Sequence, residues 1–254
     1  MMRYYRAVIE GAAVMASDLH CRPGRCRAPL LARLARILGA ESLIVLGDLF
    51  DDMHRLVSLE ELRRALKWAF GDAGGLEVYY VTSGSSHDPI LPRDLHFKAG
   101  GLRVHAYPGP LVARVDGVWA FLTHGDIALR NGAHAFLANV AAAARGVRLY
   151  LEKRLRRALR LPPSWWLIMG HTHIPGMDRS ARVANTGSWR ELWVAGLPYW
   201  RPPSNTFILV EGGELKLARL GGEVGELPWL RRLLAPSPPI MEATRLAYSR
   251  RAQR

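Results

Sequence analysis

The sequence predicts an α/β fold in which two packed sheets carry helices on their outer faces. In the first third of the 254 residues, short apolar segments alternate with amphipathic helical segments, which is typical of βαβ units and of a parallel or mixed sheet. In the rest of the chain, short strand patterns follow one another with few helices between them. A second sheet packed on the first accommodates these strands.

Three strands and two helices are predicted in the first third. The strands are expected at residues 11–18, 42–48 and 76–84, where apolar runs end in Gly or Asp. Apolar residues recur at helical spacing in residues 28–40 and 58–70. These two segments are therefore expected to be amphipathic helices that cover the sheet.

The later part of the chain is predicted to consist mainly of short strands. They are expected at residues 102–107, 110–115, 117–126, 165–173, 182–189, 205–213 and 214–220. Together with the first three strands, they supply enough chain for two sheets.

A helical insertion is expected between two of these strands, at about residues 133–161. Its first half is rich in alanine. Its second half has one apolar side among basic residues, made of Val147, Tyr150, Leu151, Leu155 and Leu159. A helix hairpin packed on the domain with a solvated basic face explains this pattern most simply. The alternatives are a lid over an acidic substrate and a helix that lies on a membrane surface.

The domain organisation follows from the linkers. No Ser/Gly-rich segment divides residues 1–223, so we expect them to form one domain that includes the insertion. Residues 224–254 contain a Pro-rich break and end in basic residues. They are expected to form a helical, basic C-terminal tail.

The formal net charge of +13 comes mainly from arginine. It suits anionic partners such as phosphate esters, nucleic acid or an acidic membrane surface, although a compositional bias towards arginine would give the same charge. No apolar run reaches the ~18 residues that cross a bilayer, and the N-terminal segment lacks the apolar core of a secretory signal. We therefore expect a cytoplasmic protein, with peripheral membrane contact through the basic helix as an alternative.

The two cysteines, Cys21 and Cys26, lie close together in the sequence. Their spacing is compatible with a small disulfide loop, whereas a reducing cytosol would keep both thiols free. A structural zinc site is not favoured, because it would need two more ligands of this kind nearby.

Polar side chains gather where five of the predicted strands end. They are Asp18 and His20, then Asp48, then the segment Gly84-Ser85-Ser86-His87-Asp88, then His124, and finally His171 and His173. A single Asp or His after a strand is usually a helix cap or a turn residue. Five such clusters in succession indicate a site, because strand ends of an α/β sheet converge on one crevice.

The residue types indicate a metal site. Carboxylate oxygens and imidazole nitrogens in similar number suit borderline divalent ions, so manganese is expected, with iron or zinc as alternatives. The number of ligands exceeds what one ion with open positions uses. We therefore expect two divalent metal ions, bridged by Asp48 because its carboxylate has two oxygens. Such a pair clamps a phosphoryl group and activates a shared water as hydroxide.

In their order, these clusters resemble the motifs of the calcineurin-like metallophosphoesterases. That family carries D-x-H, G-D-x-x-D, G-N-H-D, H-G-D and G-H-x-H. The corresponding residues here are Asp18-x-His20, Gly47-Asp48-x-x-Asp51, the variant segment 84–88, His124-Gly125-Asp126 and Gly170-His171-Thr172-His173. The resemblance runs from about Gly11 to Trp189. It implies a four-layer αββα sandwich with a helical cap insertion, and a hydrolase acting on phosphoric ester or pyrophosphate bonds.

The resemblance also implies roles for individual residues. Asp18, His20 and His173 would hold the first metal, Asp48 would bridge, and His124 and His171 would hold the second metal. Ser86 stands where the family has the Asn ligand, so we expect a looser second metal, or Asp88 or a water in place of the amide. His87 would be the general acid or transition-state donor, oriented by the carboxylate of Asp51 or Asp88.

The segment from Gly170 to Trp189, with its G-H-T-H and N-T-G-S-W sequences, resembles the branch that contains UDP-diacylglucosamine pyrophosphohydrolases. That branch has Arg at the position of His87. The resemblance implies a nucleotide-sugar or lipid-linked phosphate ester as substrate. The aromatic residues Trp189, Trp193, Tyr199 and Trp200 fit such an amphiphilic substrate, and they fit equally the burial of a C-terminal segment.

Two other functions are compatible with the sequence. A nucleic-acid phosphodiesterase would use the arginine-rich surface to hold backbone phosphates. It is not favoured, because no recognisable nucleic-acid-binding module accompanies the motifs. A non-catalytic scaffold would keep the fold with a weakened second metal site, and the intact remaining ligands argue against it.

Overall fold

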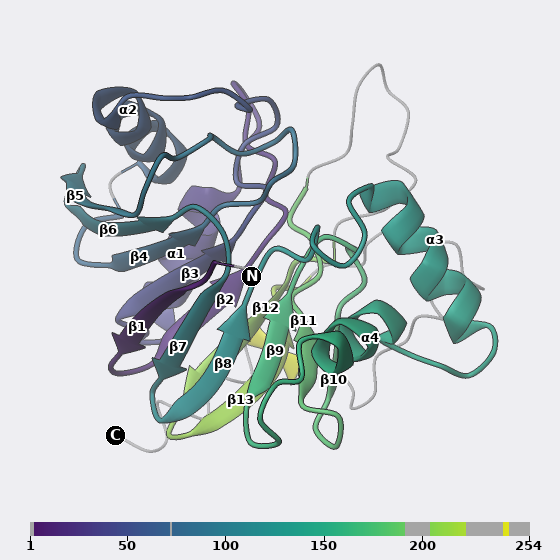
Figure 1. The fold of residues 1–254 in the computed structure, drawn as a ribbon. Coiled ribbons are helices and arrows are strands. Elements are labelled where there is room, and N and C mark those ends of the chain that lie inside the picture. The colour runs from purple at the N-terminus through teal and green to yellow at the C-terminus, as the bar shows by residue number, and fades with distance from the viewer. Residues whose placement is uncertain (1–2, 72, 191–203, 222–240, 244–254) are drawn as a thin grey trace.

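The structure is a computed structural model that describes residues 3–71, 73–190, 204–221 and 241–243. Two sheets pack face to face, and helices cover their outer faces (Figure 1). The strands are β1 (Tyr5–Ile9), β2 (Ala13–Ala16), β3 (Ser42–Leu46), β4 (Glu77–Val81), β5 (Leu95–Ala99), β6 (Leu102–Tyr107), β7 (Leu111–Val115), β8 (Val118–Leu122), β9 (Trp166–Met169), β10 (Gly176–Asp178), β11 (Val183–Asn185), β12 (Thr206–Glu211), β13 (Glu214–Arg219) and β14 (Met241–Glu242). The helices among the described residues are α1 (Ala28–Ile37), α2 (Leu59–Phe70), α3 (Gly132–Ala143) and α4 (Tyr150–Ala158).

The larger sheet contains the three strands predicted in the first third of the chain. Its order is β14-β13-β12-β2-β3-β4-β6-β5, and β2, β3, β4 and β6 run parallel. The smaller sheet has the order β1-β7-β8-β9-β11-β10, with β8 and β9 parallel. The parallel neighbours bring the carboxyl ends of β2, β3 and β4 to one edge, and those of β8 and β9 to one edge of the other sheet.

Both faces of the central strands are buried, which explains why they appear in the sequence as unbroken apolar runs. In β3, Leu43 and Val45 point into the core that α1 and α2 cover. Ile44 and Leu46 point the other way, into the core between the two sheets. The outer face of the smaller sheet packs against α4. These four layers confirm the αββα sandwich that the resemblance implies.

The two N-terminal helices begin close to where the sequence places them. Helix α2 is preceded by Ser58, whose hydroxyl accepts from the backbone N–H of Glu61, and the Glu61 carboxylate accepts from Ser58 N–H. This reciprocal pair fixes the start of the helix.

Four strands were not predicted: β1, β5, β10 and β14. In β1, side chains alternate between exposed and partly buried, and β5 alternates in the same way. In β1 and β5, therefore, only every second residue is shielded from solvent. The other two strands are short: β10 has three residues and β14 has two. Their apolar signal is correspondingly weak.

The insertion between β8 and β9 forms two helices, α3 and α4. Leu151 and Leu155 are buried, and Leu155 and Leu159 belong to the apolar cluster on the smaller sheet, as their spacing predicts. Val147 is 43% exposed, so it does not belong to this apolar side. It lies before the first turn of α4, where helical spacing no longer applies. No helix of the described residues is long and apolar enough to cross a membrane.

Two further sequence expectations concern cysteines and tryptophans. Cys21 and Cys26 form a disulfide, which closes the loop that follows His20. Trp189 is fully buried and donates its indole N–H to the carbonyl oxygen of Thr206 at 2.6 Å. Trp189 therefore stabilises the core. Trp193, Tyr199 and Trp200 lie outside the described residues, as does nearly all of the tail 224–254.

Candidate metal centre

The polar clusters converge where strands of both sheets end. Asp18 and His20 follow β2, Asp48 follows β3, and His87 follows β4 in the larger sheet. His124 follows β8, and His171 and His173 follow β9 in the smaller sheet. Three overlapping groups have ligand atoms within 4.8 Å of one another: Asp18, His20 and His173; His20, Asp48 and His87; Asp18, Asp48 and His124.

Five of these residues have a left-handed backbone. The φ angles are 53° for Asp18, 48° for His20, 50° for Asp48, 67° for His171 and 58° for His173. Residues with a Cβ rarely adopt this conformation, which costs roughly 1–2 kcal/mol each. Such strain persists where function requires a particular side-chain direction, and here it turns the side chains out of the strand direction and into the crevice.

Two glycines make room for these side chains. Gly47 has φ +73°, and a Cβ there would lie 2.6 Å from Cγ of His124. A Cβ at Gly170 would lie 2.0 Å from the Ser17 hydroxyl and 2.4 Å from Oδ2 of Asp18. Gly47 and Gly170 are therefore required because a loop of the other sheet packs directly against each of them.

The carboxylate of Asp48 faces both sides of the centre. Its Oδ2 lies 3.7 Å from Nε2 of His20, which belongs to the larger sheet. Its Oδ1 lies 3.3 Å from Nε2 of His124, which belongs to the smaller sheet. A carboxylate whose two oxygens face two separate imidazoles has the geometry that a bridging ligand needs.

One side of the centre is formed by Asp18, His20 and His173. Oδ1 of Asp18 lies 2.9 Å from Nε2 of His173. Oδ2 of Asp18 accepts from the Ser17 hydroxyl and from the backbone N–H of His171, which fixes the carboxylate plane. Both ring nitrogens of His20 are buried and make no hydrogen bond to any described residue. Buried imidazole nitrogens without hydrogen bonds are expected where a metal ion completes the site.

On the other side, two imidazoles face each other. His124 donates its Nδ1–H to the carbonyl oxygen of Leu46 at 3.0 Å, and His171 donates its Nε2–H to that of Leu129 at 2.7 Å. These bonds leave Nε2 of His124 and Nδ1 of His171 facing each other, 3.0 Å apart. If both rings were neutral, two lone pairs would repel each other beside the Asp48 carboxylate unless a cation lay between them. A proton or a metal ion fulfils this need.

The charges at the centre follow from burial and pairing. Burial opposes ionisation of Asp48, but His124 outweighs it and holds the pKa of Asp48 well below its ordinary value. Although burial works against the charged ring, Asp48 raises the pKa of His124 well above its ordinary value. Burial lowers the pKa of His20 and of His171. These two rings are therefore neutral at neutral pH and keep a lone pair for a cation.

His87 lies at the crevice, and one of its ring nitrogens is hydrogen-bonded to the backbone. Its Nδ1 lies 2.6 Å from the backbone carbonyl oxygen of Asp51, so it carries the proton and donates. The ring meets His20 edge to face, with 4.5 Å between the centroids. The Asp51 carboxylate instead accepts from the Arg190 guanidinium at 3.1 Å and lies 3.4 Å from Nδ1 of His20. The carbonyl of Asp51, and not its carboxylate, therefore orients His87.

Asp88 contacts the loops and not the crevice. It is fully buried, and its two oxygens accept from the Tyr80 hydroxyl and from the backbone N–H groups of Asp48, Leu49 and Ser83. Burial raises the pKa of Asp88, and the neighbouring Asp48 adds to this effect. Asp88 thus holds the loops after β3 and β4 together, and it neither orients His87 nor faces a metal.

Of the two serines that could align with the family's Asn, Ser85 and not Ser86 contacts Asp48. Its hydroxyl lies 2.5 Å from Oδ1 of Asp48, and Ser83 donates to the same oxygen at 2.8 Å. Ser86 is exposed at the edge of the pocket. The sequence does not reveal this, because the segment has two serines and is longer than the family motif, so either one aligns with Asn.

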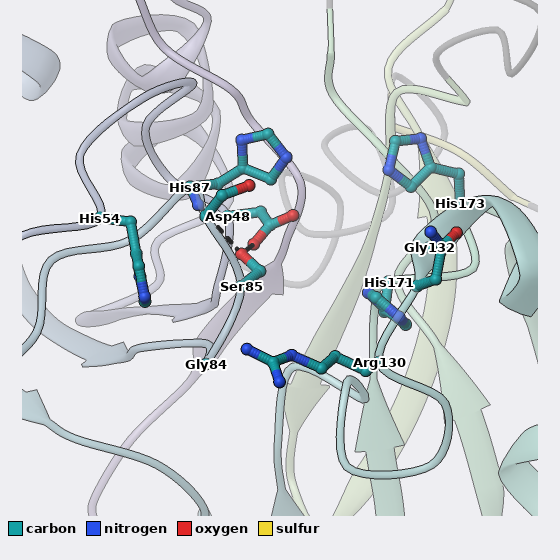
Figure 2. Close-up of a pocket in the computed structure, with 11 residues that line it drawn as sticks. Asp48, His54, Gly84, Ser85, His87, Arg130, Gly132, His171 and His173 are labelled. Carbon is teal, nitrogen blue, oxygen red and sulfur yellow. Dashed lines mark hydrogen bonds between the residues drawn. The ribbon is translucent and has the colours of Figure 1, made fainter.

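The crevice opens into a pocket of about 500 Å³. Its lining includes Asp48, Ser85 and His87 on one side and His171 and His173 on the other (Figure 2). Arg130 enters the pocket from the start of the insertion, and Figure 2 shows its guanidinium pointing towards the side formed by Gly84 and Ser85. Sequence reasoning missed Arg130 because it is one of many arginines and lies outside every motif.

A second buried group links the insertion to the loop of His171 and His173. Glu152 of α4 is fully buried and accepts from the side-chain amides of Asn185 at 2.8 Å and Asn139 at 3.1 Å. Asn185 also donates to the carbonyl oxygen of Gly170 at 2.7 Å. The insertion therefore fixes the backbone from which His171 and His173 project.

These residues fit a pair of divalent ions. The centre has the mixed oxygen and nitrogen ligands of borderline metals, two neutral imidazoles, buried nitrogens without hydrogen bonds in His20, and a carboxylate facing both ways.

No family model and no curated protein matches the chain. Solved structures do match, and two of them are similar to 85% of the chain. One is YfcE, a phosphoesterase from E. coli, with 16% identity over 97% of that chain and a TM-score of 0.41. The other is protein TM1076 from Thermotoga maritima, with 20% identity over 99% of that chain and a TM-score of 0.39. At these values neither similarity decides the function, which rests on the geometry of the site.

We expect Gly47→Ala to weaken metal binding, because the new Cβ collides with the ring of His124. Displacement of a ligand by a neighbouring change should lower the affinity for Mn²⁺ by roughly 10–100-fold. Isothermal titration of the purified variant with Mn²⁺ measures this.

The matched control is Gly117→Ala, in the turn between β7 and β8. Gly117 has φ +86° and nothing within 4 Å of its Cβ position, so it carries the same backbone strain without a collision. Equal loss of Mn²⁺ affinity in both variants would show that general destabilisation, and not displacement of His124, causes the effect.

Proposed function

We propose that the protein is a dinuclear metal-dependent phosphoesterase. The observation that carries this proposal is the orientation of Asp48, whose two oxygens face imidazoles from the two sheets. Asp18, His20 and His173 would hold one ion, His124 and His171 the other, and Asp48 both. When bound, such ions supply an activated water and neutralise the charge of a phosphoryl group.

His87 is suited to protonate the leaving oxygen. Its Nδ1–H is held by the carbonyl oxygen of Asp51, which fixes the orientation of the ring. The remaining Nε2 can then carry a proton to the oxygen that departs from phosphorus. This role needs an imidazole that is partly accessible, and His87 lines the pocket.

The pocket favours a small phosphate ester. A volume of about 500 Å³ is typical of sites for small molecules. Arg130 supplies a guanidinium suited to a phosphate group, whose oxygens it binds in pairs. Nucleotide-sugar pyrophosphates, including lipid-linked ones, are therefore the first substrates to test.

Asp48→Ala should abolish Mn²⁺-dependent hydrolysis, because it removes the group shared by both ions. The assay is release of p-nitrophenol from bis-(p-nitrophenyl) phosphate, followed by a series of nucleotide-sugar pyrophosphates. The control is Asp52→Ala, which removes an exposed carboxylate four residues away and should leave the rate unchanged. A wild-type protein that is inactive with Mn²⁺, Zn²⁺ and Fe²⁺ on all of these substrates would contradict the proposal.

His87→Ala should lower kcat by roughly 10²–10⁴-fold and leave the metal content unchanged, because a general acid is lost and no ligand. Metal content is measured by elemental analysis and kcat with the same diester. Loss of a metal equivalent would instead make His87 a ligand, which its place in a group with His20 and Asp48 allows.

Arg130→Ala should raise KM by roughly 10–100-fold, as expected for a lost hydrogen bond to a charged group, with a smaller change in kcat. Arg130→Lys should recover part of the loss, since it restores the charge without the paired donors. The control is Arg145→Ala, an exposed arginine at the end of α3 that does not line the pocket. If KM rises equally in Arg145→Ala, the effect comes from overall charge and Arg130 has no specific role.

A further inference from the structure

Two histidines form a pair on the larger sheet, away from the metal centre. His96 of β5 and His105 of β6 are directly opposite each other in the antiparallel register. Strand β5 is the edge strand of the described sheet, so the pair borders solvent. The His96 side chain is 52% exposed and that of His105 is 25% exposed. Both belong to strands, whereas the ligands of the candidate metal centre belong to loops after strands.

The inner nitrogens of the pair face each other and the outer nitrogens face carboxylates. The Nδ1 atoms lie 2.8 Å apart. Nε2 of His105 lies 2.9 Å from Oε1 of Glu77, and Nε2 of His96 lies 3.4 Å from Oδ2 of Asp94. Each ring therefore has an acceptor at Nε2 and the other ring at Nδ1.

This arrangement determines the protonation of the rings. A carboxylate accepts a hydrogen bond from Nε2–H, so Glu77 and Asp94 favour the tautomer that leaves Nδ1 without a proton. In that tautomer both Nδ1 atoms present lone pairs to each other at 2.8 Å, an arrangement that a cation between them stabilises. A single shared proton satisfies the pair, and so does a metal ion.

The ring of His105 is held in place from two sides. Tyr79 stacks on it with 4.7 Å between centroids and an angle of 11° between the planes. Glu77, in turn, lies 3.5 Å from Nε of Arg103, which fixes the carboxylate. In protein metal sites, an imidazole ligand is commonly oriented by a carboxylate that contacts its other nitrogen. Here Glu77 contacts His105 in this way and Asp94 contacts His96.

We propose that His96 and His105 form a second metal site, for a borderline divalent ion of the Zn²⁺ type. The two Nδ1 atoms would be the protein ligands, and water would fill the remaining positions on the open side. Two nitrogens on a tetrahedral Zn²⁺ are about 3.3 Å apart, so the two Nδ1 atoms need to separate by about 0.5 Å and the rings need to turn until both lone pairs point to one ion. Imidazole ligands without a carboxylate favour Zn²⁺, Ni²⁺ or Cu²⁺ over Mn²⁺.

Zn²⁺ stoichiometry of the full-length protein tests this proposal. Equilibrium dialysis against Zn²⁺, with elemental analysis, should give one equivalent fewer in His96→Ala and in His105→Ala than in the wild type. The control is His134→Ala, which removes an exposed histidine of α3 and should bind as the wild type does. Glu77→Gln should retain the site with an affinity lowered by roughly 10–100-fold, because it changes only the orientation and basicity of His105.

Two results would overturn the proposal. If the wild type and both histidine variants bind the same number of Zn²⁺ ions, the pair holds a proton only. If His134→Ala loses an equivalent as well, removal of any surface histidine explains the loss. Circular dichroism of each variant confirms that the fold is kept, and neither result depends on phosphoesterase activity.

Discussion

The buried carboxylate of Asp48 is the interaction on which the candidate centre depends. It follows a central strand of the larger sheet, and its two oxygens face His20 on one side and His124 on the other. Burying a carboxylate is costly unless it is paired, so the groups around it must be held in place. Ser83 and Ser85 contact it through hydroxyls, and Asp88 anchors its backbone N–H. Loops from the two sheets therefore meet at one charge, and the proposed ions would neutralise it.

The surrounding structure holds ligand loops in conformations that they would not adopt alone. Left-handed backbone at Asp18, Asp48 and His171 costs free energy. The buried hydrogen bonds of Asp88 and of Glu152 offset that cost, because each ties a ligand loop to a neighbouring element. Asp88 belongs to the larger sheet and Glu152 to the helical insertion. The insertion thus contributes both Arg130 to the pocket and support to the loop of His171.

The sequence was informative where both faces of an element are buried or where a motif has fixed spacing. It predicted α1, α2 and the central strands. An unbroken apolar run such as that of β3 is stable only where both faces of the strand are buried. It did not predict β1 or β5, because a strand with one exposed face at a sheet edge has only alternate apolar residues. Motif spacing identified Asp48 and the histidines but not which atoms they use. That the carbonyl of Asp51 orients His87, and that Ser85 reaches Asp48, depends on loop conformation, which no spacing encodes.

Two histidine pairs among the described residues, His124 with His171 and His96 with His105, differ in their surroundings. In each pair, acceptors on the outer nitrogens leave lone pairs facing across 3.0 Å or 2.8 Å. In the buried pair the acceptors are carbonyls and Asp48 adds a carboxylate oxygen beside the lone pairs, which suits harder ions such as Mn²⁺. In the exposed pair the carboxylates of Glu77 and Asp94 lie behind the rings, so only nitrogen faces the ion. The same imidazole geometry would therefore favour different metals in the two proposed sites, because the carboxylate would be a direct neighbour of the ion in one pair and an outer partner in the other.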